Sequence, residues 1–220
     1  MEKLIEKLNE FGENVKTVST EADLQILFEK LAPAFLYGGY IQVRTDYRVY
    51  IRTVEFYFHS EKPDGIHDPI VYHRNIRDFK GNIVSEVPYF PIMSLHSHDS
   101  GYDIAFESET EQYRASVLIR SYEVKDKEGK YLEWDKKSMF VKHPTYKFNT
   151  QSTYLRKLLN GFSLGNNGDI KWVDFSTKQL IVPKVKSRQN VLQSESDFVY
   201  KKKIGEKCKR EWSFTREEEI

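Results

Sequence analysis

Cysteine is nearly absent from this sequence, because Cys208 is the only one among the 220 residues. An internal disulfide bond is therefore excluded. A zinc cluster is not expected either, because this lone thiol, set among basic residues at 207, 209 and 210, lacks companion ligands. We interpret Cys208 as an ordinary, partly exposed thiol.

Long hydrophobic runs are also missing, and no stretch reaches the roughly 18 apolar residues that suggest a membrane-spanning helix. The amino-terminal residues MEKLIEKLNEF are amphipathic and are interrupted by Glu and Lys, which is not the pattern of a signal peptide. We therefore expect an intracellular, cytoplasmic protein that has no membrane partner.

The sequence also lacks a clear excess of either charge. Its 34 Lys and Arg against 33 Asp and Glu give a net charge of +1 at pH 7. Proteins that bind duplex DNA usually carry a strong excess of basic residues. A local excess exists near the carboxy terminus, where residues 201–210 hold six basic residues and one acid. Because most charge runs are simply solvated surface, this run supports DNA binding only weakly.

The rest of the composition is typical of an ordered globular protein, with 39% hydrophobic, 14% aromatic and 30% charged residues. A chain of this length can bury one sizeable core without a second domain. No internal repeat or linker divides it. We therefore predict a single domain, residues 1–220.

Two helices are predicted at the amino terminus, within residues 1–32. The first spans about residues 2–11, where apolar side chains recur at helical spacing before a glycine. The second begins after Thr20, with an acid three positions further on as in a capping box. It is expected to end at about Leu31, because Pro33 and two glycines follow.

From Tyr40 onward the sequence is rich in β-branched and aromatic residues, which predicts strands. A hairpin with its turn near residues 45–46 comes first, and residues 60–88 read as a long irregular excursion. Together with the helices, these strands predict an α+β fold. Further strands are expected at 93–98, 102–107, 115–124, 170–175, 179–183 and 212–214, and a third helix at 153–162.

Glu55 is the first candidate for chemistry. Alternation along the second strand of the hairpin places Glu55 and Tyr57 on one face and Val54 on the other. If Glu55 faces the core side, it is a partly buried carboxylate suited to act as a general base. If it faces water, it is one of many solvated acids.

A series of motifs favours the first interpretation. Residues 52–57 read Arg-Thr-Val-Glu-Phe-Tyr, and a loop that contains Asp64 and His67 follows. This resembles the alkyladenine (3-methyladenine) DNA glycosylase family, which has a strand R-I-V-E-x-E-x-Y followed by an acid-rich loop and a histidine. The catalytic Glu and the pocket Tyr of the family stand two positions apart, as Glu55 and Tyr57 do.

The resemblance continues in the same order over about residues 25–215. The segment 117–124, VLIRSYEV, is similar to the family's V-L-I-R-A-L-E-P and matches Arg120 to its arginine. Shorter matches occur at Arg74, Asn75 and Phe79, at 100–102, at 155–162, at Arg188 and at 211–214.

The resemblance implies a curved, mostly antiparallel sheet with flanking helices, a fold related to the carboxy-terminal domain of formyltransferases. Residues 1–32 would supply the amino-terminal helices and residues 40–215 the glycosylase-like core. It also implies a monomer that uses no cofactor and no metal and that binds double-stranded DNA. Because a stacked base shields its N-glycosidic bond, such an enzyme must flip the damaged purine out of the duplex.

The same resemblance implies roles for four residues. Glu55 would orient and deprotonate a water molecule for attack on the sugar carbon, and Arg120 would hold the water or a phosphate. Tyr57 and His67 would sandwich the extruded base. From the residues alone, His67 could be an ordinary loop histidine and Arg120 a structural ion-pair partner.

Counting back from Arg120 places Ser97 and Glu107 in the base pocket, where the family has a tyrosine and an asparagine. Ser100 stands in place of the tyrosine that fills the gap left by a flipped base, and Tyr102 is the alternative wedge. The residues expected to contact DNA are Ser100, Tyr102, Lys184, Lys186 and Arg188.

Two other functions remain open. Glu107 adds negative charge to a site that must receive a polyanion, so a non-catalytic nucleic-acid-binding protein of the same fold is the second hypothesis. The third is a cupin-like metal-dependent enzyme, because His96 and His98 would share one face of a strand and Asp103 follows. Two imidazoles and a carboxylate can bind Zn, Fe or Mn. We favour ordinary pocket or surface histidines here.

Overall fold

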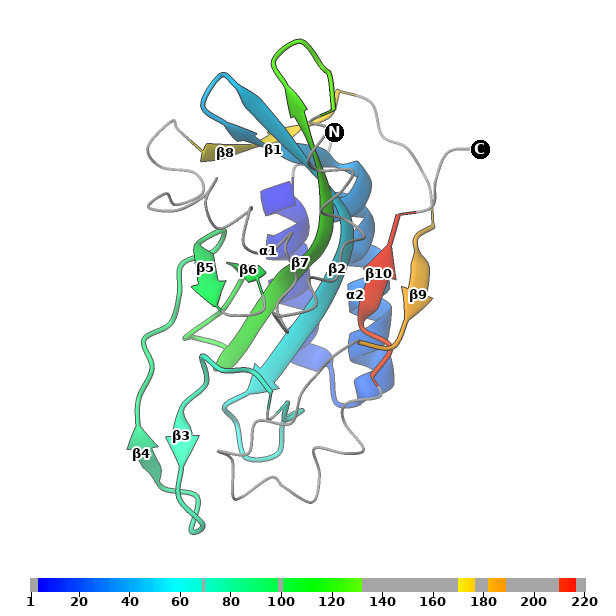
Figure 1. Ribbon diagram of the computed structural model, residues 1–220. Coiled ribbons are helices and arrows are strands. Elements are labelled where there is room, and N and C mark those ends of the chain that lie inside the picture. Colours follow the sequence, from blue (N-terminus) through cyan, green and yellow to red (C-terminus); the bar gives the residue numbers. More distant parts are fainter. Residues whose placement is uncertain are drawn as a thin grey trace, which may run out of the picture.

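Two helices precede a curled sheet in the computed structural model of this protein (Figure 1). The structure describes residues 4–68, 70–98, 101–131, 170–176, 182–188 and 210–216. The helical elements are α1 (Leu4–Asn14), the short 3-10 helix η1 (Val15–Thr17) and α2 (Glu21–Tyr37).

Helix α2 begins as predicted but ends later. The side chain of Thr20 caps it by accepting a hydrogen bond from the backbone N–H of Asp23 at 3.1 Å. The prediction that Pro33 ends the helix is wrong, because the helix continues through it to Tyr37. Proline inside a helix costs about 3 kcal/mol. Burial of Phe35 and Leu36 beyond the proline offsets that cost.

Eight strands form one sheet, and all strand pairs between described residues are antiparallel. The order is β5-β6-β7-β2-β1-β8, and β10 pairs with both β2 and β9. The strands are β1 (Gly39–Val43), β2 (Tyr47–Ser60), β5 (Leu95–His98), β6 (Gly101–Ala105), β7 (Tyr113–Asp126), β8 (Ile170–Asp174), β9 (Lys184–Lys186) and β10 (Ser213–Thr215).

The expected hairpin is β1–β2, and the excursion over residues 60–88 is mostly irregular, as predicted. It also contains a small hairpin that the sequence did not suggest, formed by β3 (Ile76–Arg77) and β4 (Ile83–Ser85). The predicted helix at 153–162 lies outside the described residues. Most of the strand predicted at 179–183 also lies outside them. Its two described residues, 182–183, are not in a strand.

In the long strand pair β2–β7, the side chains that face the core change from odd-numbered to even-numbered positions of β2 where the register is irregular. Ile51 lies opposite Tyr122 and Val54 opposite Ile119, so two residues on each strand separate these pairs. The buried apolar positions of β2 therefore shift from odd numbers, such as Ile51, to even numbers, such as Val54 and Phe56. Bulges of this kind redirect side chains locally.

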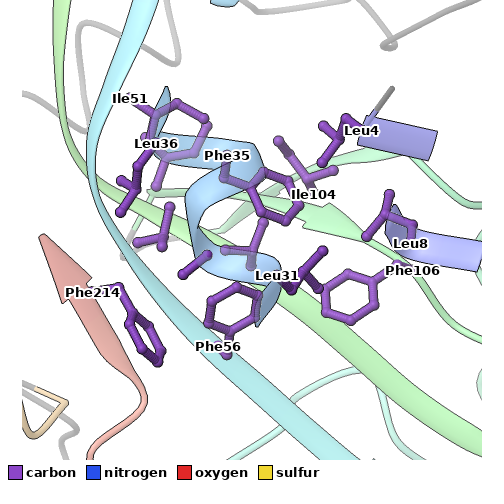
Figure 2. Packing of buried hydrophobic residues seen from close by; sticks show 14 of the residues in the cluster. Leu4, Leu8, Leu31, Phe35, Leu36, Ile51, Phe56, Ile104, Phe106 and Phe214 are labelled. Atoms are coloured by element: carbon purple, nitrogen blue, oxygen red, sulfur yellow. The ribbon is translucent and has the colours of Figure 1, made fainter. Parts of the chain in front are cut away.

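One face of the sheet packs against the helices and forms the hydrophobic core. Phe56 of β2 stacks on Phe28 of α2, with ring centroids 4.6 Å apart, and meets Phe214 of β10 edge-on at 5.5 Å. Figure 2 shows side chains from both helices and from the strands converging around Phe56. This arrangement matches the expected α+β class, with the sheet and both helices sharing one core.

Over much of its area the opposite face of the sheet is also buried, and there it is largely polar. Glu55 and Arg114 are 1% and 0% exposed, and Asp103 and Glu107 are 3% and 5% exposed. The excursion after β2 is hydrogen-bonded to this face, for example through the carbonyl of Val87, which accepts from Arg114 at 2.6 Å. Buried charged groups are costly unless they are paired, so this face is where a functional site is best sought.

Candidate functional site

Glu55, Tyr57 and Arg120 form a compact group on the polar face. The Nε of Arg120 donates to Oε2 of Glu55 at 2.6 Å, and the hydroxyl of Tyr57 donates to the same oxygen at 3.0 Å. The side chain of Glu55 is 1% exposed and that of Arg120 is 20% exposed. Two donors on one carboxylate oxygen fix the orientation of the carboxyl group.

The sheet explains why these residues meet across 65 positions of sequence. Alternation along β2 puts Glu55 and Tyr57 on one face, as predicted. Glu55 lies opposite Leu118 on β7, and Arg120, two positions further along β7, points to the same face by alternation. On its other edge β2 pairs with β10, where Ser213 lies opposite Glu55. The site is therefore held on a strand that is paired along both edges.

Burial and charge determine the protonation of Tyr57 and Arg120. Burial, and then the charge of Glu55, raise the pKa of the Tyr57 hydroxyl well above its usual value. Tyr57 therefore stays a proton donor at neutral pH. Burial alone would lower the pKa of Arg120, but Tyr57 and Glu55 outweigh it and raise that pKa. Arg120 is a permanent cation beside the carboxylate.

Arg188 covers the ring of Tyr57. Its guanidinium lies 4.7 Å from the centroid of the Tyr57 ring, and its Nη1 is 2.7 Å from Oδ2 of Asp68. Burial favours the neutral form of Asp68, but Arg188 and Arg210 outweigh it and lower the pKa of Asp68. Arg188, expected from the sequence to contact DNA, is thus buried within the protein, whereas Lys184 and Lys186 are exposed on β9.

A second buried group lies around Glu107. One carboxylate oxygen of Glu107 is in contact with Nδ1 of His73, and the other accepts from Nη1 of Arg114 at 3.1 Å and from the backbone N–H of Phe90 at 2.9 Å. Arg114 also donates to Glu61 at 3.2 Å. These bonds attach the excursion to the sheet, which is a structural role for Glu107 that its assignment to a base pocket did not anticipate.

Ser116 lies between the two groups. It stands directly opposite Tyr57 in the β2–β7 register. Its hydroxyl lies 3.4 Å from Nε2 of His73 and donates to Oδ2 of Asp103 at the same distance. Ser116 thus links the group around Glu107 to Asp103, next to the strand position of Tyr57.

His73, Arg114 and Asp68 also belong to this face and were not predicted from the sequence. The alternation that identified Glu55 and Tyr57 continues along β2 and could have flagged the buried His59. The same reading of β7 could have flagged Arg114. No local pattern marks Asp68 or His73, because they lie in an irregular segment.

The structure also locates His67, Tyr102 and Ser97, which were predicted for the site. His67 lies edge-on to the ring of His59, with centroids 5.1 Å apart, and its Nε2 is 3.1 Å from the carbonyl of Pro63. Tyr102, expected at a DNA surface, is instead 4% exposed within the hydrophobic core, because alternation in β6 points it toward the helices with Ile104. Ser97 pairs with Tyr102 in the β5–β6 register, and Ser100 lies outside the described residues.

The alternative metal site has two of its residues close together. His96 and Asp103 lie directly opposite each other in β5 and β6. The His96 ring stacks on Phe90, with centroids 3.6 Å apart, and its Nε2 is 3.0 Å from the hydroxyl of Ser94. Among the described residues, no group of three or more His, Cys, Asp or Glu side chains could hold a metal ion. The side chain of His98 lies outside that set.

Among its described residues the protein has no helix that is both long and apolar enough to cross a membrane. Comparisons of the chain with protein-family models, with curated proteins and with solved structures gave no match.

Proposed function

We propose that the protein hydrolyses the N-glycosidic bond of a damaged purine flipped out of duplex DNA, with Glu55 as the general base. The observation that carries this proposal is the shared hydrogen bonding of Glu55 with Arg120 and Tyr57 on a buried strand. These three residues also stand at the glycosylase-like positions of the sequence. A carboxylate held in one orientation beside a permanent cation suits the activation of water.

The reaction would use these side chains as follows. A water oxygen attacks the sugar carbon while Glu55 takes a proton from the water. The bond between that carbon and the purine nitrogen breaks, and its electron pair leaves with the base. Arg120 compensates the charge of Glu55 inside the protein, because an unpaired buried carboxylate would be costly. It would also position the water or a neighbouring phosphate.

Tyr57 supplies the surface against which the base would stack. In this structure a planar guanidinium, that of Arg188, lies over the Tyr57 ring at 4.7 Å. A flipped base would take the same place, so Arg188 would have to move aside when substrate enters. Stacking on an aromatic ring is favourable for any base, and a positively charged alkylated purine gains an added cation–π attraction.

The closed state of the site also favours a second candidate, a nucleic-acid-binding protein of this fold that has no catalytic activity. Glu55 is 1% exposed, and Tyr57, at 9%, lies beneath Arg188. If the pair of Arg188 and Asp68 does not open, no base can reach Glu55. The two candidates predict the same affinity for DNA and opposite results in an assay for base release.

Purified protein should be incubated with duplex oligonucleotides that each carry one alkylated, deaminated or etheno purine, and the abasic sites should be cleaved with alkali. We expect cleavage of at least one duplex, and a loss of about 100- to 10,000-fold in rate for Glu55→Gln. Glu29→Gln, an exposed position on α2, is the matched control and should retain full activity. Binding of all these duplexes without cleavage by the wild type would favour the non-catalytic candidate.

A further inference from the structure

A hollow with aromatic and basic walls lies on the same face of the sheet as Glu55. It is lined by residues of β2, by the end of β7 and by Phe175, which follows β8, and Figure 1 shows the β1–β2 turn, the end of β7 and β8 at one end of the sheet. We call it the aromatic hollow. Its volume is about 370 Å³, and its aromatic walls are Tyr50, Tyr131 and Phe175. Pockets of this size accept groups as large as a nucleotide.

The rings in and beside the hollow lie close together. Tyr50 and Phe175 are nearly parallel, at 17° with centroids 6.2 Å apart, and Tyr40 stands beside both at 5.4 and 5.8 Å. Lys125 lies over two rings, 5.1 Å from the centroid of Tyr50 and 4.4 Å from that of Tyr131. Flat aromatic surfaces with a cation above them are therefore already present.

These rings do not belong to the hydrophobic core. Tyr50 lies between Val49 and Ile51, which point to the helix side and are buried, so Tyr50 points to the other face. Tyr50 and Phe175 are each only partly buried, and Tyr131 is 36% exposed. Partly exposed rings gathered on the open face of a sheet are typical of a binding surface.

The charge of the hollow is positive, although the whole chain is nearly neutral. Among its described lining residues, Arg52, Lys125 and Arg216 are cations and Glu123 is the one acid. Arg52 donates to Glu123 at 2.5 Å, so that acid is already compensated. Cations therefore outnumber acids among the described lining residues, and Lys125 lies directly over the rings. The ligand that fits is an anion with flat aromatic groups.

We propose that the aromatic hollow binds an unpaired nucleic-acid strand, whose bases stack on Tyr50 and Phe175 and whose phosphates contact Lys125 and Arg216. Aromatic platforms inside a basic groove are how proteins hold single strands without reading their sequence. Because Tyr50 precedes Glu55 by five positions in β2, the stacked bases would lie roughly 17 Å from Glu55. The binding itself does not depend on hydrolysis at Glu55.

Fluorescence anisotropy with a labelled thymidine oligonucleotide of about 12 nucleotides tests the proposal. Tyr50→Ala should weaken binding on the order of tenfold or more, and Tyr50→Phe, which keeps the ring, should stay within about twofold of wild type. Lys125→Gln should reduce the slope of log affinity against log salt by about 0.7 between roughly 50 and 200 mM salt.

Two control variants distinguish binding at the aromatic hollow from nonspecific attraction to positive charge and from binding at the Glu55 site. Lys30→Gln removes an exposed cation on α2 and should leave affinity and salt dependence unchanged. Glu55→Gln should bind the oligonucleotide as the wild type does, so the proposal can fail or hold independently of glycosylase activity. Thermal unfolding curves of Tyr50→Ala, Tyr50→Phe and Lys125→Gln, compared with that of the wild type, test whether the variants are folded at the temperature of the binding assay.

The proposal is overturned if the oligonucleotide does not bind in low salt, or if Tyr50→Ala and Lys125→Gln, both folded, bind it as the wild type does. It is also overturned if polyglutamate displaces the oligonucleotide as well as unlabelled thymidine strands do. In that case only charge, and no stacking of bases, would account for the binding.

Discussion

Arg188 and Asp68, which are 120 positions apart, form an ion pair in which neither side chain has any exposed surface. This pair joins the segment after β9 to the excursion after β2. Arg188 also lies over the Tyr57 ring, so one residue links the stability of the protein to the closure of the site.

The first prediction concerns this ion pair. Arg188→Met leaves Asp68 buried with Arg210 as its remaining basic neighbour, 3.5 Å away. We expect a loss of about 3 kcal/mol in the free energy of unfolding, measured by urea denaturation at neutral pH. Arg188→Met combined with Asp68→Asn removes both charges and should lose less. Equal losses in the single and double variants would show that the charge on Asp68 is not what destabilises the single variant.

The second prediction concerns His59, which is 2% exposed. Burial, and then the charges of His67 and Arg74, lower the pKa of His59 to about 3. Its usual value is about 6.5, so between these two pH values the unfolded chain takes up a proton that the folded protein does not. Acidification from about pH 6.5 toward 3 should therefore cost up to about 1.4 kcal/mol of stability per pH unit from this group.

Urea denaturation of the wild type and of His59→Gln at several pH values measures this contribution. The difference between the two unfolding free energies should shrink steadily as the pH falls below about 6.5, because the glutamine does not titrate. Curves that stay parallel over this range would contradict a neutral, buried His59.

The third prediction tests the core beneath the site. Phe56 is fully buried and contacts rings from α2 and β10 (Figure 2). Phe56→Ala should lower the free energy of unfolding by about 3–5 kcal/mol. Phe79→Ala, at an 83% exposed position, is the control and should change stability by less than about 0.5 kcal/mol. Similar losses in both variants would argue against the packing of Phe56.

The fourth prediction concerns the hydrogen bond from Tyr57 to Glu55. Tyr57→Phe keeps the ring for stacking but removes the donor that holds Oε2 of Glu55. Since a hydrogen bond to a charged group is worth about 1.5 kcal/mol or more, base release should slow roughly tenfold while DNA affinity is unchanged. Tyr72→Phe, at a 51% exposed position, should have no effect on either quantity.

Alternation and spacing in the sequence predicted much of this arrangement. The two amino-terminal helices, the β1–β2 hairpin and the shared face of Glu55 and Tyr57 all follow from local patterns, and the structure contains them. Arg120 was predicted only through the order of motifs. Alternation along β7 places Arg120 on the same face as Leu118, but the pairing of Leu118 with Glu55 of β2 is a long-range contact that no local pattern reveals.

Other features depend on contacts that are distant in sequence. Packing of Phe35 and Leu36 carries α2 through Pro33, against the usual effect of proline. Tyr102 was predicted at a DNA surface, but its strand turns it into the core. The burial of Arg188 depends on Asp68, which lies in the excursion after β2, so a basic run in the sequence could not indicate it.

The central claim is that Glu55 and Arg120 act as one unit in base release. Single-turnover rates on a duplex that the wild type cleaves should be measured for Glu55→Gln, Arg120→Gln and the double variant. We predict a loss of about 100-fold or more for Glu55→Gln and no further loss in the double variant, because residues that act together are not additive. A Glu55→Gln protein that releases the base as fast as the wild type would contradict the account.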